Sequence, residues 1–206
     1  VVLAVSALAR TAGAARPRAD AAAAAGGGAG MAGIGDDPGP PEGRPTPPAP
    51  LGEEHDLSSF DCGEPALNDW LRERARKNES RFSRTYVVCD GTRVVGFYSL
   101  SAGSVERAAA PGRLRRNAPD AVPVSVIGRL AGDRAWSGRG LGADLLADAL
   151  RRIAVAAQSI GIGAVLVHAK SDAARRFYLG CAEFIEYPQD SRTLFLPIET
   201  VVVGME

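Results

Sequence analysis

The sequence predicts a single mixed α/β domain over residues 51–206. Three observations support this fold class. Apolar runs of five to seven residues alternate with segments of helical periodicity. A hairpin-type turn signal, Asp90-Gly91, separates two of these runs. Every aromatic residue lies between Phe60 and Phe195, and a stretch of this length can bury one hydrophobic core.

Residues 1–50 have a different composition. Alanine, glycine and proline make up 32 of these residues, and there is no aromatic residue among them. Such a segment cannot bury enough apolar surface to offset the entropy lost on ordering, so we expect a disordered extension. Met31 is the only methionine before the domain, and we expect translation to begin there. An intact mass of the native protein that includes Val1 would contradict this start site.

The first half of the domain predicts one helix followed by a β-hairpin. Pro65–Lys77 has a proline in its first turn and one apolar face at helical spacing. That face comprises Leu67, Trp70, Leu71 and Ala75. Apolar runs over Thr85–Cys89 and Val94–Leu100 flank the Asp90-Gly91 turn, which predicts two paired strands. A loop that contains proline and several arginines follows over residues 106–121.

The second half predicts alternating strands and helices. Val124–Leu130 is an apolar run that predicts a strand, and the glycine-rich turn 138–142 joins it to a helix over Leu141–Gln158. The buried stripe of this helix is expected to comprise Leu146, Leu150, Ile153 and Ala157. A strand, a short helix and two closing strands complete the domain, at Ala164–His168, Asp172–Gly180, Phe184–Tyr187 and Thr193–Ile198.

Composition argues against several function classes. No run reaches the ~18 apolar residues of a membrane-spanning helix, and an arginine interrupts the short apolar start, so we expect neither a membrane span nor export. Cys62, Cys89 and Cys181 are widely spaced, which indicates a reducing cytoplasm and argues against a disulfide framework or a structural zinc site. His55 and His168 are too far apart for a zinc-hydrolase helix, and we expect no metal.

The segment richest in chemistry is the turn Trp136-Ser-Gly-Arg-Gly-Leu-Gly142. Its glycines let backbone N–H groups approach an anion closely, and the helix that follows offers its positive end. Together with Arg139, this pattern favours phosphate or pyrophosphate binding over a turn that needs glycine for geometry alone. The spacing also matches a dinucleotide fingerprint, but the turn comes late in the domain and no acidic residue follows the strand Ala164–His168. A P-loop is excluded because no Gly-Lys-Ser/Thr is present.

Four stretches, in this order along the chain, carry a family resemblance. They are Phe60-Asp-Cys-Gly63 with Leu67-x-x-Trp-Leu71, Arg84-Thr-Tyr-Val-Val88, Val126 to Gly142, and Val165-Leu-Val-His-Ala-Lys170 followed by Arg176-Phe-Tyr178. They resemble the GNAT N-acetyltransferases and, more narrowly, the GNAT toxins of bacterial toxin–antitoxin modules. The resemblance covers about Leu51 to Pro197. The chain departs from the family at Ser137, where a Gln or Arg is usual, and in the segment after Tyr178.

The resemblance implies the GNAT fold, a central, mostly antiparallel sheet with flanking helices, and acetyl-CoA as co-substrate. It implies that backbone groups of Leu130, Ala131 and Gly132 hold the pantetheine arm and polarise the thioester carbonyl, because the end of their strand separates from its neighbour. The residues expected to bind the diphosphate are Ser137, Gly138, Arg139, Gly140, Leu141 and Gly142.

Tyr178 is the expected catalytic acid. A phenol, with a pKa of about 10, can protonate a leaving thiolate, and the resemblance places the acid at this tyrosine. Of the two adjacent aromatic residues, we expect Phe177 to face the core. No general base stands out, because a histidine at a strand tip, such as His168, is more often a packing residue. A base is unnecessary if the acceptor is an α-amine, whose pKa of about 8 leaves much of it neutral.

The charges are segregated along the chain although the net charge is zero. Six acidic and no basic residues lie between Glu53 and Asp69, whereas eleven basic and four acidic residues lie between Arg72 and Arg116. The preference for arginine in this basic segment suggests phosphate contacts rather than an ordinary solvated face. The expected nucleic-acid contacts are Arg72, Arg76, Lys77, Arg84, Arg115 and Arg116.

Together with the resemblance, the basic segment favours aminoacyl-tRNA as the acceptor, with acetylation of its α-amine blocking translation. One alternative is a GNAT enzyme for a small-molecule amine or a protein N-terminus, although cationic acceptors would favour an acidic cleft. Another is a non-catalytic acyl-CoA or nucleic-acid-binding module. The resemblance also implies a ribbon–helix–helix antitoxin and a second copy of the chain as partners, and a cytoplasmic location.

Overall fold

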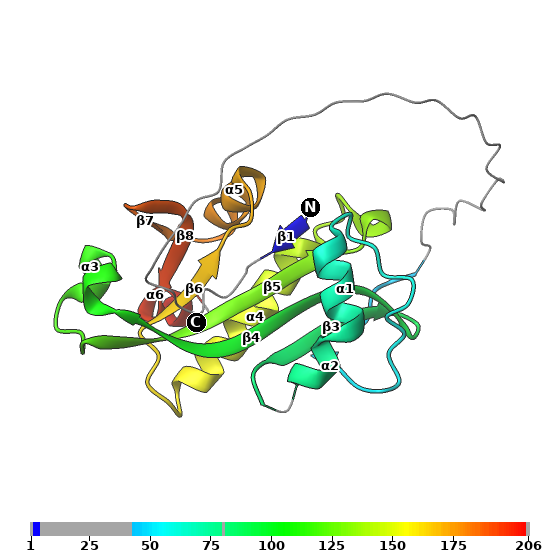
Figure 1. Ribbon diagram of the computed structural model, residues 1–206, viewed down its shortest axis with the longest axis horizontal. Coiled ribbons are helices and arrows are strands. Elements are labelled where there is room, and N and C mark those ends of the chain that lie inside the picture. The colour runs from blue at the N-terminus through cyan, green and yellow to red at the C-terminus, as the bar shows by residue number, and fades with distance from the viewer. Residues whose placement is uncertain (1, 5–42, 80, 205–206) are drawn as a thin grey trace, which may run out of the picture.

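The computed structural model describes residues 2–4, 43–79 and 81–204, and its centre is an eight-stranded mixed sheet (Figure 1). The strands are β1 (Val2–Ala4), β2 (Ala49–Pro50), β3 (Arg84–Asp90), β4 (Arg93–Glu106), β5 (Ala121–Gly132), β6 (Ala164–His168), β7 (Ile185–Tyr187) and β8 (Asp190–Pro197). The helices are α1 (Pro65–Glu73), α2 (Ala75–Asn78), α3 (Gly112–Arg115), α4 (Leu141–Ala157), α5 (Asp172–Cys181) and α6 (Ile198–Val203), with 3-10 turns η1 (Arg107–Ala109) and η2 (Arg134–Trp136).

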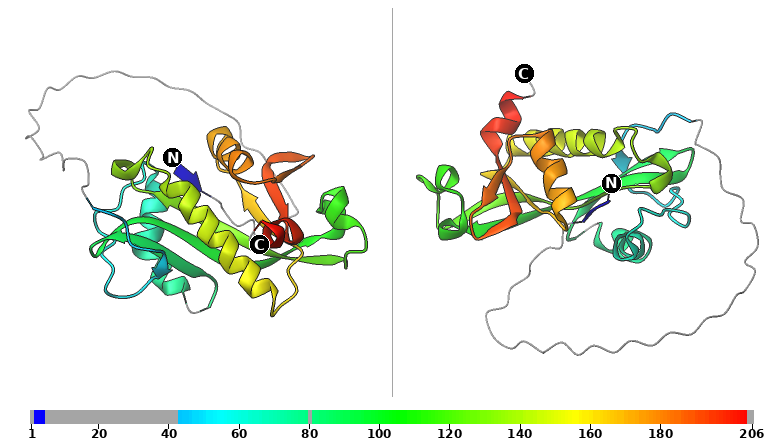
Figure 2. Two further views of the ribbon diagram at one scale, coloured as in Figure 1. Left: turned by 180° about the vertical axis from the view of Figure 1, so that it is seen from behind. Right: turned by 90° about the horizontal axis from the view of Figure 1, so that it is seen from above.

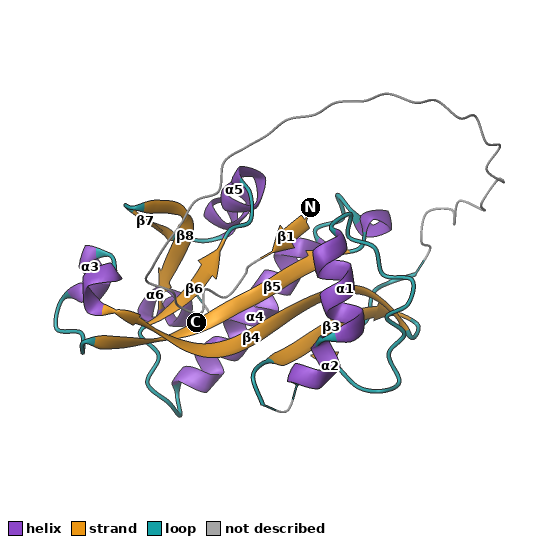
Figure 3. Ribbon diagram, viewed as in Figure 1, coloured by secondary structure: helices purple, strands orange, loops and turns teal. Residues whose placement is uncertain are grey.

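The sheet has the order β2-β3-β4-β5-β6-β8-β7, and β1 pairs with β5 outside this path. All neighbouring strands are antiparallel except β5 and β6, which are parallel and are connected through α4. Figure 2 shows α4 and α6 over one face of the sheet and α1 and α2 over the other. The predicted fold class, a mostly antiparallel sheet with flanking helices, is confirmed (Figure 3).

Two apolar clusters hold the helices to the two faces of the sheet. The larger lies under α4 and includes Tyr98, Leu130, Leu145 and Ile153, all at most 2% exposed. The second lies under α1, whose Leu67 and Leu71 pack against Phe97. These buried α1 residues belong to the apolar face expected from the sequence. A third, smaller cluster joins β5, β6 and β8.

The helix α4 follows its predicted span closely, and its buried face is wider than expected. Leu141, Leu145 and Ala149 are buried in addition to Leu146 and Ile153. Leu150 and Ala157, which we expected in the stripe, are half-buried at its edge. Leu141 fits closely over the sheet because a Cβ at Gly96 or Gly132, paired residues of β4 and β5, would lie 3.2 or 3.3 Å from its Cδ2 atom.

Several elements differ from the sequence prediction. The helix expected over Pro65–Lys77 is interrupted at Arg74, whose φ of −115° separates α1 from α2. The strand β4 extends six residues past Leu100 because it pairs with β5 along that whole length, which outweighs the weak strand propensity of its Ser, Ala and Gly residues. The helix α6 was not expected, since its run of β-branched residues reads as a continuation of β8.

We expected residues 1–50 to form a disordered extension, and most of them, residues 1 and 5–42, lie outside the described residues. The described residues 43–50 belong to the fold, because Thr46 exchanges hydrogen bonds with Cys89, and Arg152 donates to the Pro48 carbonyl at 3.0 Å. Among the described helices, none is long and apolar enough to cross a membrane.

We expect Leu145→Ala to lower the free energy of unfolding by about 2–5 kcal/mol, because the fully buried side chain would leave a cavity under α4. Val155→Ala on the same helix is the control, and should change it by less than about 0.5 kcal/mol because Val155 is exposed. Urea denaturation followed by circular dichroism measures both values. Equal losses in the two variants would contradict the packing described for α4.

Candidate functional site

The strands β5 and β6 separate after a short paired stretch, and this leaves one edge of β5 open. Pairing joins Val124–Val126 to Ala164–Leu166, whereas β5 continues to Gly132. A shift in register against β4 leaves Gly128 as an extra residue at the point of separation. The strand β1 pairs with β5 at residues 129–131 and contacts α5, so this edge accepts an extended chain. The open edge contains Leu130 and Ala131, two of the residues expected to hold the coenzyme.

The glycine-rich turn after η2 has the geometry of an anion site. Gly138 and Gly140 have φ angles of +76° and +82°, a conformation that side chains disfavour, and Gly140 begins the 17-residue helix α4 without a side-chain cap. The backbone amides of Gly138, Gly140, Leu141 and Gly142 donate no hydrogen bond to any other described residue. These amides and the positive end of α4 fit a diphosphate.

Neighbouring side chains fix the start of this turn. Ser137, which stands where the family usually has Gln or Arg, is exposed and ends η2 with an extended backbone. The guanidinium of Arg139 lies over the indole of the buried Trp136, 5.2 Å from its ring. The aromatic residue thus holds η2 against the core, while the exposed glycines after it remain accessible.

A network of carboxylates, which the sequence analysis did not predict, holds η2, the 3-10 turn directly before the glycine-rich turn. Asp133, only 4% exposed, accepts hydrogen bonds from the amides of Ala135 and Asp61 and pairs with Arg93 at 3.2 Å. Asp61 in turn pairs with Arg134. Hydrogen bonds from the Gly63 amide, the Asn68 side chain and Arg134 lower the pKa of Asp61 to about 2. The available sequence signal was Asp133 itself, an N-capping residue directly before a short helical turn.

Tyr178 is fully buried, and its hydroxyl has no hydrogen-bond partner among the described residues. Its ring packs edge-on against Phe177 and Phe184, with centroids 5.4 and 5.6 Å away. Burial, reinforced by Cys181, raises the pKa of the phenol, so it stays protonated. The expectation that Phe177 would face the core instead is wrong, because Phe177 is only half-buried. Tyr178 faces the interior from α5 and belongs to the same apolar cluster as Leu130 and Leu194.

The candidate base, His168, has a structural partner. Its Nδ1 atom lies 2.8 Å from the hydroxyl of Thr193, which itself donates to Asp190. Burial lowers the pKa of the imidazole, although Asp190 opposes this shift. His168 therefore joins β6 to β8, in line with the expectation that it is a packing residue.

The expected nucleic-acid contacts do not form one cluster. Arg76 donates to the His55 and Gly52 carbonyls at 2.7 and 3.3 Å, and Arg72 donates to the Phe60 carbonyl at 2.6 Å, so both hold the loop before α1. The other four side chains make no ion pair within the described ranges, and all are exposed: Lys77, Arg84, Arg115 and Arg116. Arg115 ends α3 and Arg116 is its C-cap residue, at the tip of the β4–β5 arm (Figure 1). Arg84 pairs with Leu100, and β4 continues from there for six more residues, or roughly 20 Å.

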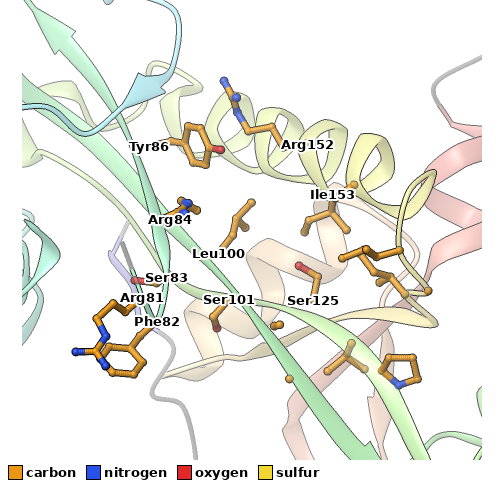
Figure 4. A pocket seen from close by; sticks show the side chains of 18 residues that line it. Arg81, Phe82, Ser83, Arg84, Tyr86, Leu100, Ser101, Ser125, Arg152 and Ile153 are labelled. Atoms are coloured by element: carbon orange, nitrogen blue, oxygen red, sulfur yellow. The ribbon is translucent and has the colours of Figure 1, made fainter. Parts of the chain in front are cut away.

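A cavity of about 410 Å³ lies between α4 and strands β3 to β5 (Figure 4). Tyr86 and Arg84 enter it from β3, and Arg152 and Ile153 from α4, with the guanidinium of Arg152 only 3.9 Å from the Tyr86 ring. None of its 18 lining residues belongs to the glycine-rich turn. This cavity is therefore separate from the expected coenzyme site.

Residues 51–182 match the Acetyltransferase (GNAT) family. The chain belongs to this family. Over 133 residues it is 53% identical to a tRNA-acetylating toxin of Mycobacterium tuberculosis, a match that covers 64% of this chain and 80% of the relative. A solved structure of AtaT complexed with acetyl-methionyl-tRNAfMet is similar at a TM-score of 0.72 and 31% identity, covering 79% of this chain and all of that one. The resemblance drawn from four sequence motifs is thus confirmed.

A further solved structure contains a tyrosine-to-phenylalanine mutant of AtaT bound to the C-terminus of the antitoxin AtaR and to acetyl-CoA. It is 30% identical to this GNAT chain, with a TM-score of 0.67, and covers 78% of this chain and 98% of its own. Acetyl-CoA therefore binds a protein with this fold. In the present GNAT domain, the helix α5 that carries Tyr178 adjoins both parts of the expected coenzyme site, because it contacts β1 on the open edge of β5, and a Cβ at Gly142 would lie 3.4 Å from the ring of Phe177.

We expect Asp133→Asn to destabilise the protein by about 3 kcal/mol and to weaken coenzyme A binding. The asparagine carbonyl can still cap η2, but its NH2 group replaces the oxygen that accepts from Arg93 and from the Asp61 amide, so Arg93 loses its counter-ion. Thermal unfolding and titration calorimetry with coenzyme A measure the two effects. Asp120→Asn is the control, since its pair with Arg107 is exposed and should contribute less than about 1 kcal/mol. Identical behaviour of the two variants would refute the anchoring role.

Proposed function

We propose that this protein transfers the acetyl group of acetyl-CoA to the α-amine of an aminoacyl-tRNA, and that it acts as the toxin of a toxin–antitoxin pair. The observation that carries this proposal is the open edge of β5, which occurs together with an amide cradle before α4 and with a buried Tyr178 hydroxyl that has no hydrogen-bond partner among the described residues. The 53% identity to a tRNA-acetylating toxin supports the choice of acceptor. An acetylated α-amine cannot form a peptide bond, so translation would stop.

In this mechanism the amides of Gly138 to Gly142 bind the diphosphate, and the backbone of Leu130 to Gly132 aligns the pantetheine arm. The strand β1 uses the same edge, so the coenzyme binds when Val2–Ala4 leaves it. A backbone amide directed at the thioester carbonyl stabilises the oxyanion that forms when the amine attacks. Most of the rate enhancement then comes from holding the two reactants in place.

Tyr178 completes the reaction as the acid. When the new C–N bond forms and the C–S bond breaks, the thiolate takes the phenolic proton and the amine loses one to solvent. The phenolate regains a proton from solvent when the products leave, which restores the acid. The raised pKa of Tyr178 does not prevent this step, because a thiolate formed in the same dry pocket also has its pKa raised by desolvation. The α-amine needs no protein base, which agrees with the structural role of His168.

The tRNA backbone would contact four exposed cations that make no ion pair among the described residues: Lys77, Arg84, Arg115 and Arg116. Arg72 and Arg76 support this surface indirectly, since both are held by backbone carbonyls. We also propose that an antitoxin of the ribbon–helix–helix type binds the protein, that the protein forms a homodimer, and that it acts in the cytoplasm, where charged tRNA is found. Residues 51–206 form the acetyltransferase domain in this proposal. Incubation of a mixed aminoacyl-tRNA pool with labelled acetyl-CoA, followed by identification of the labelled species, tests the function directly.

We expect Tyr178→Phe to retain acetyl-CoA binding and to lose about 10²–10⁴-fold in kcat, because only the proton donor is removed. Single-turnover kinetics and calorimetry separate the two quantities. Tyr187→Phe is the matched control, a half-buried tyrosine of β7 that packs on Phe195 away from the strand opening. Undiminished turnover in Tyr178→Phe would remove this residue from the catalytic role.

Acetylation of tRNA should weaken steeply with salt, because each neutralised phosphate releases counterions. We expect the double variant Arg115→Gln/Arg116→Gln to raise the KM for tRNA and to reduce the salt slope by about two, with the KM for acetyl-CoA unchanged. Arg151→Gln, which removes an exposed arginine of α4 paired with Asp148, should leave the slope unchanged. A wild-type rate that is insensitive to salt between about 50 and 200 mM would argue against a tRNA acceptor.

A further inference from the structure

A second cavity, of about 830 Å³, lies on the α1 face of the sheet. Its walls come from α1, α2 and the turn after α2, and its floor is formed by β4 and by Gly128 and Arg129 of β5. Arg129 directly precedes Leu130, where the thioester carbonyl is expected. The cavity therefore lies next to the expected position of the thioester, on the face of the sheet opposite to α4. We call it the acceptor cavity.

Arg129 is a half-buried cation without a counter-ion. Its guanidinium lies 4.1 Å from the ring of Trp70, which is itself stacked on Phe97 at 5.9 Å and 14°. The side chain makes no hydrogen bond or ion pair with any residue in the described part of the chain, and burial lowers its pKa. A partly desolvated charge held in one orientation and left unpaired is suited to an anionic ligand. The stacking on Trp70 leaves the edge of the guanidinium free to donate hydrogen bonds.

The mouth of the acceptor cavity carries an exposed aromatic side chain. Phe82 is 68% exposed, lines the cavity, and has Arg81 5.5 Å from its ring. An apolar ring that protrudes beside cations is the pattern that proteins use to stack unpaired bases. The lining also includes Glu73, which is exposed and has no ion pair among the described residues, and its carboxylate can accept a hydrogen bond from the neutral acceptor amine. Groups suited to an anion, a base and an amine thus line one cavity.

We propose that the acceptor cavity receives the unpaired 3′ end of the charged RNA, with a backbone phosphate on Arg129 and a base stacked on Phe82. This inference rests on the proposed function and deepens it, because it identifies which residues read the end of the substrate as nucleic acid. A simple amine carries no phosphate, so it would leave Arg129 without a partner.

The test compares two acceptors of the same amino acid, an aminoacyl-tRNA and a phosphate-free 3′-aminoacyl-adenosine. We expect Arg129→Gln to lower kcat/KM for the tRNA by a factor of about 10 to 100, the usual contribution of a charge-assisted hydrogen bond, and to change it less than about twofold for the adenosine. Arg129→Lys should restore part of the loss, and the KM for acetyl-CoA should stay constant. Arg151→Gln is the control for loss of an arginine outside the cavity.

Equal losses for both acceptors in Arg129→Gln, or no loss for the tRNA, would overturn the inference. Phe82→Ala provides a second test that does not depend on Arg129, because a side chain so exposed contributes little to folding. It should lower kcat/KM for the tRNA about tenfold while Phe82→Tyr preserves it, and an unchanged value in Phe82→Ala would also refute the subsite. If the wild-type protein acetylates no aminoacyl-tRNA, the proposed function itself fails, which is a distinct result.

Discussion

The separation of β5 from β6 after Val126 is the structural feature on which the site depends. Two parallel strands that remained paired would satisfy each other's backbone groups and leave no place for a ligand. The extra residue Gly128 turns β5 away, and Leu141 packs against Gly96 and Gly132, which fixes the beginning of α4 at the end of the diverging strand. The open edge and the helix N-terminus are therefore held at one point by packing.

Three kinds of polar group without a partner among the described residues belong to the proposed site. In most proteins nearly all buried polar groups are paired, so each exception needs a reason. Among the described residues, the buried hydroxyl of Tyr178 is such an exception, as are other atoms with no part in the proposed reaction, such as Thr85 Oγ1 and Arg175 Nε. The amides of Gly138 and Gly140, which are exposed, and the half-buried guanidinium of Arg129 also have no partner within the described residues. In the proposed reaction, the amides would bind the diphosphate of the coenzyme, the phenol would donate a proton to the thiolate, and the guanidinium would bind a phosphate of the nucleic acid. Transfer from an acyl thioester coenzyme to a nucleic acid would use all three.

The basic segment shows why a run of charge in sequence differs from a surface that binds. Arg72, Arg76 and Arg93 are each tied to a carbonyl or carboxylate of the fold and hold loops around the site. Arg115 and Arg116, from the same segment, lie at the tip of an extended two-stranded arm. Arginines from one sequence segment therefore have two different roles, some structural and some exposed, because the long strand β4 places the two ends of the segment far apart.

The sequence by itself determined the fold class, most strand positions, the glycine-rich turn and the span of α4, because these depend on local periodicity and on residues with special backbone freedom. Strand length was less predictable: the last part of β4 exists only because β5 pairs with it. Which of Phe177 and Tyr178 turns inward was decided by the packing of α5 against β6 and β8, which adjacent positions in a short helix cannot reveal. The anchoring by Asp133 and the stacking of Arg129 on Trp70 join residues 40 or more positions apart. Such contacts are decided by tertiary structure alone, since they arise when separate elements converge on the same strand end.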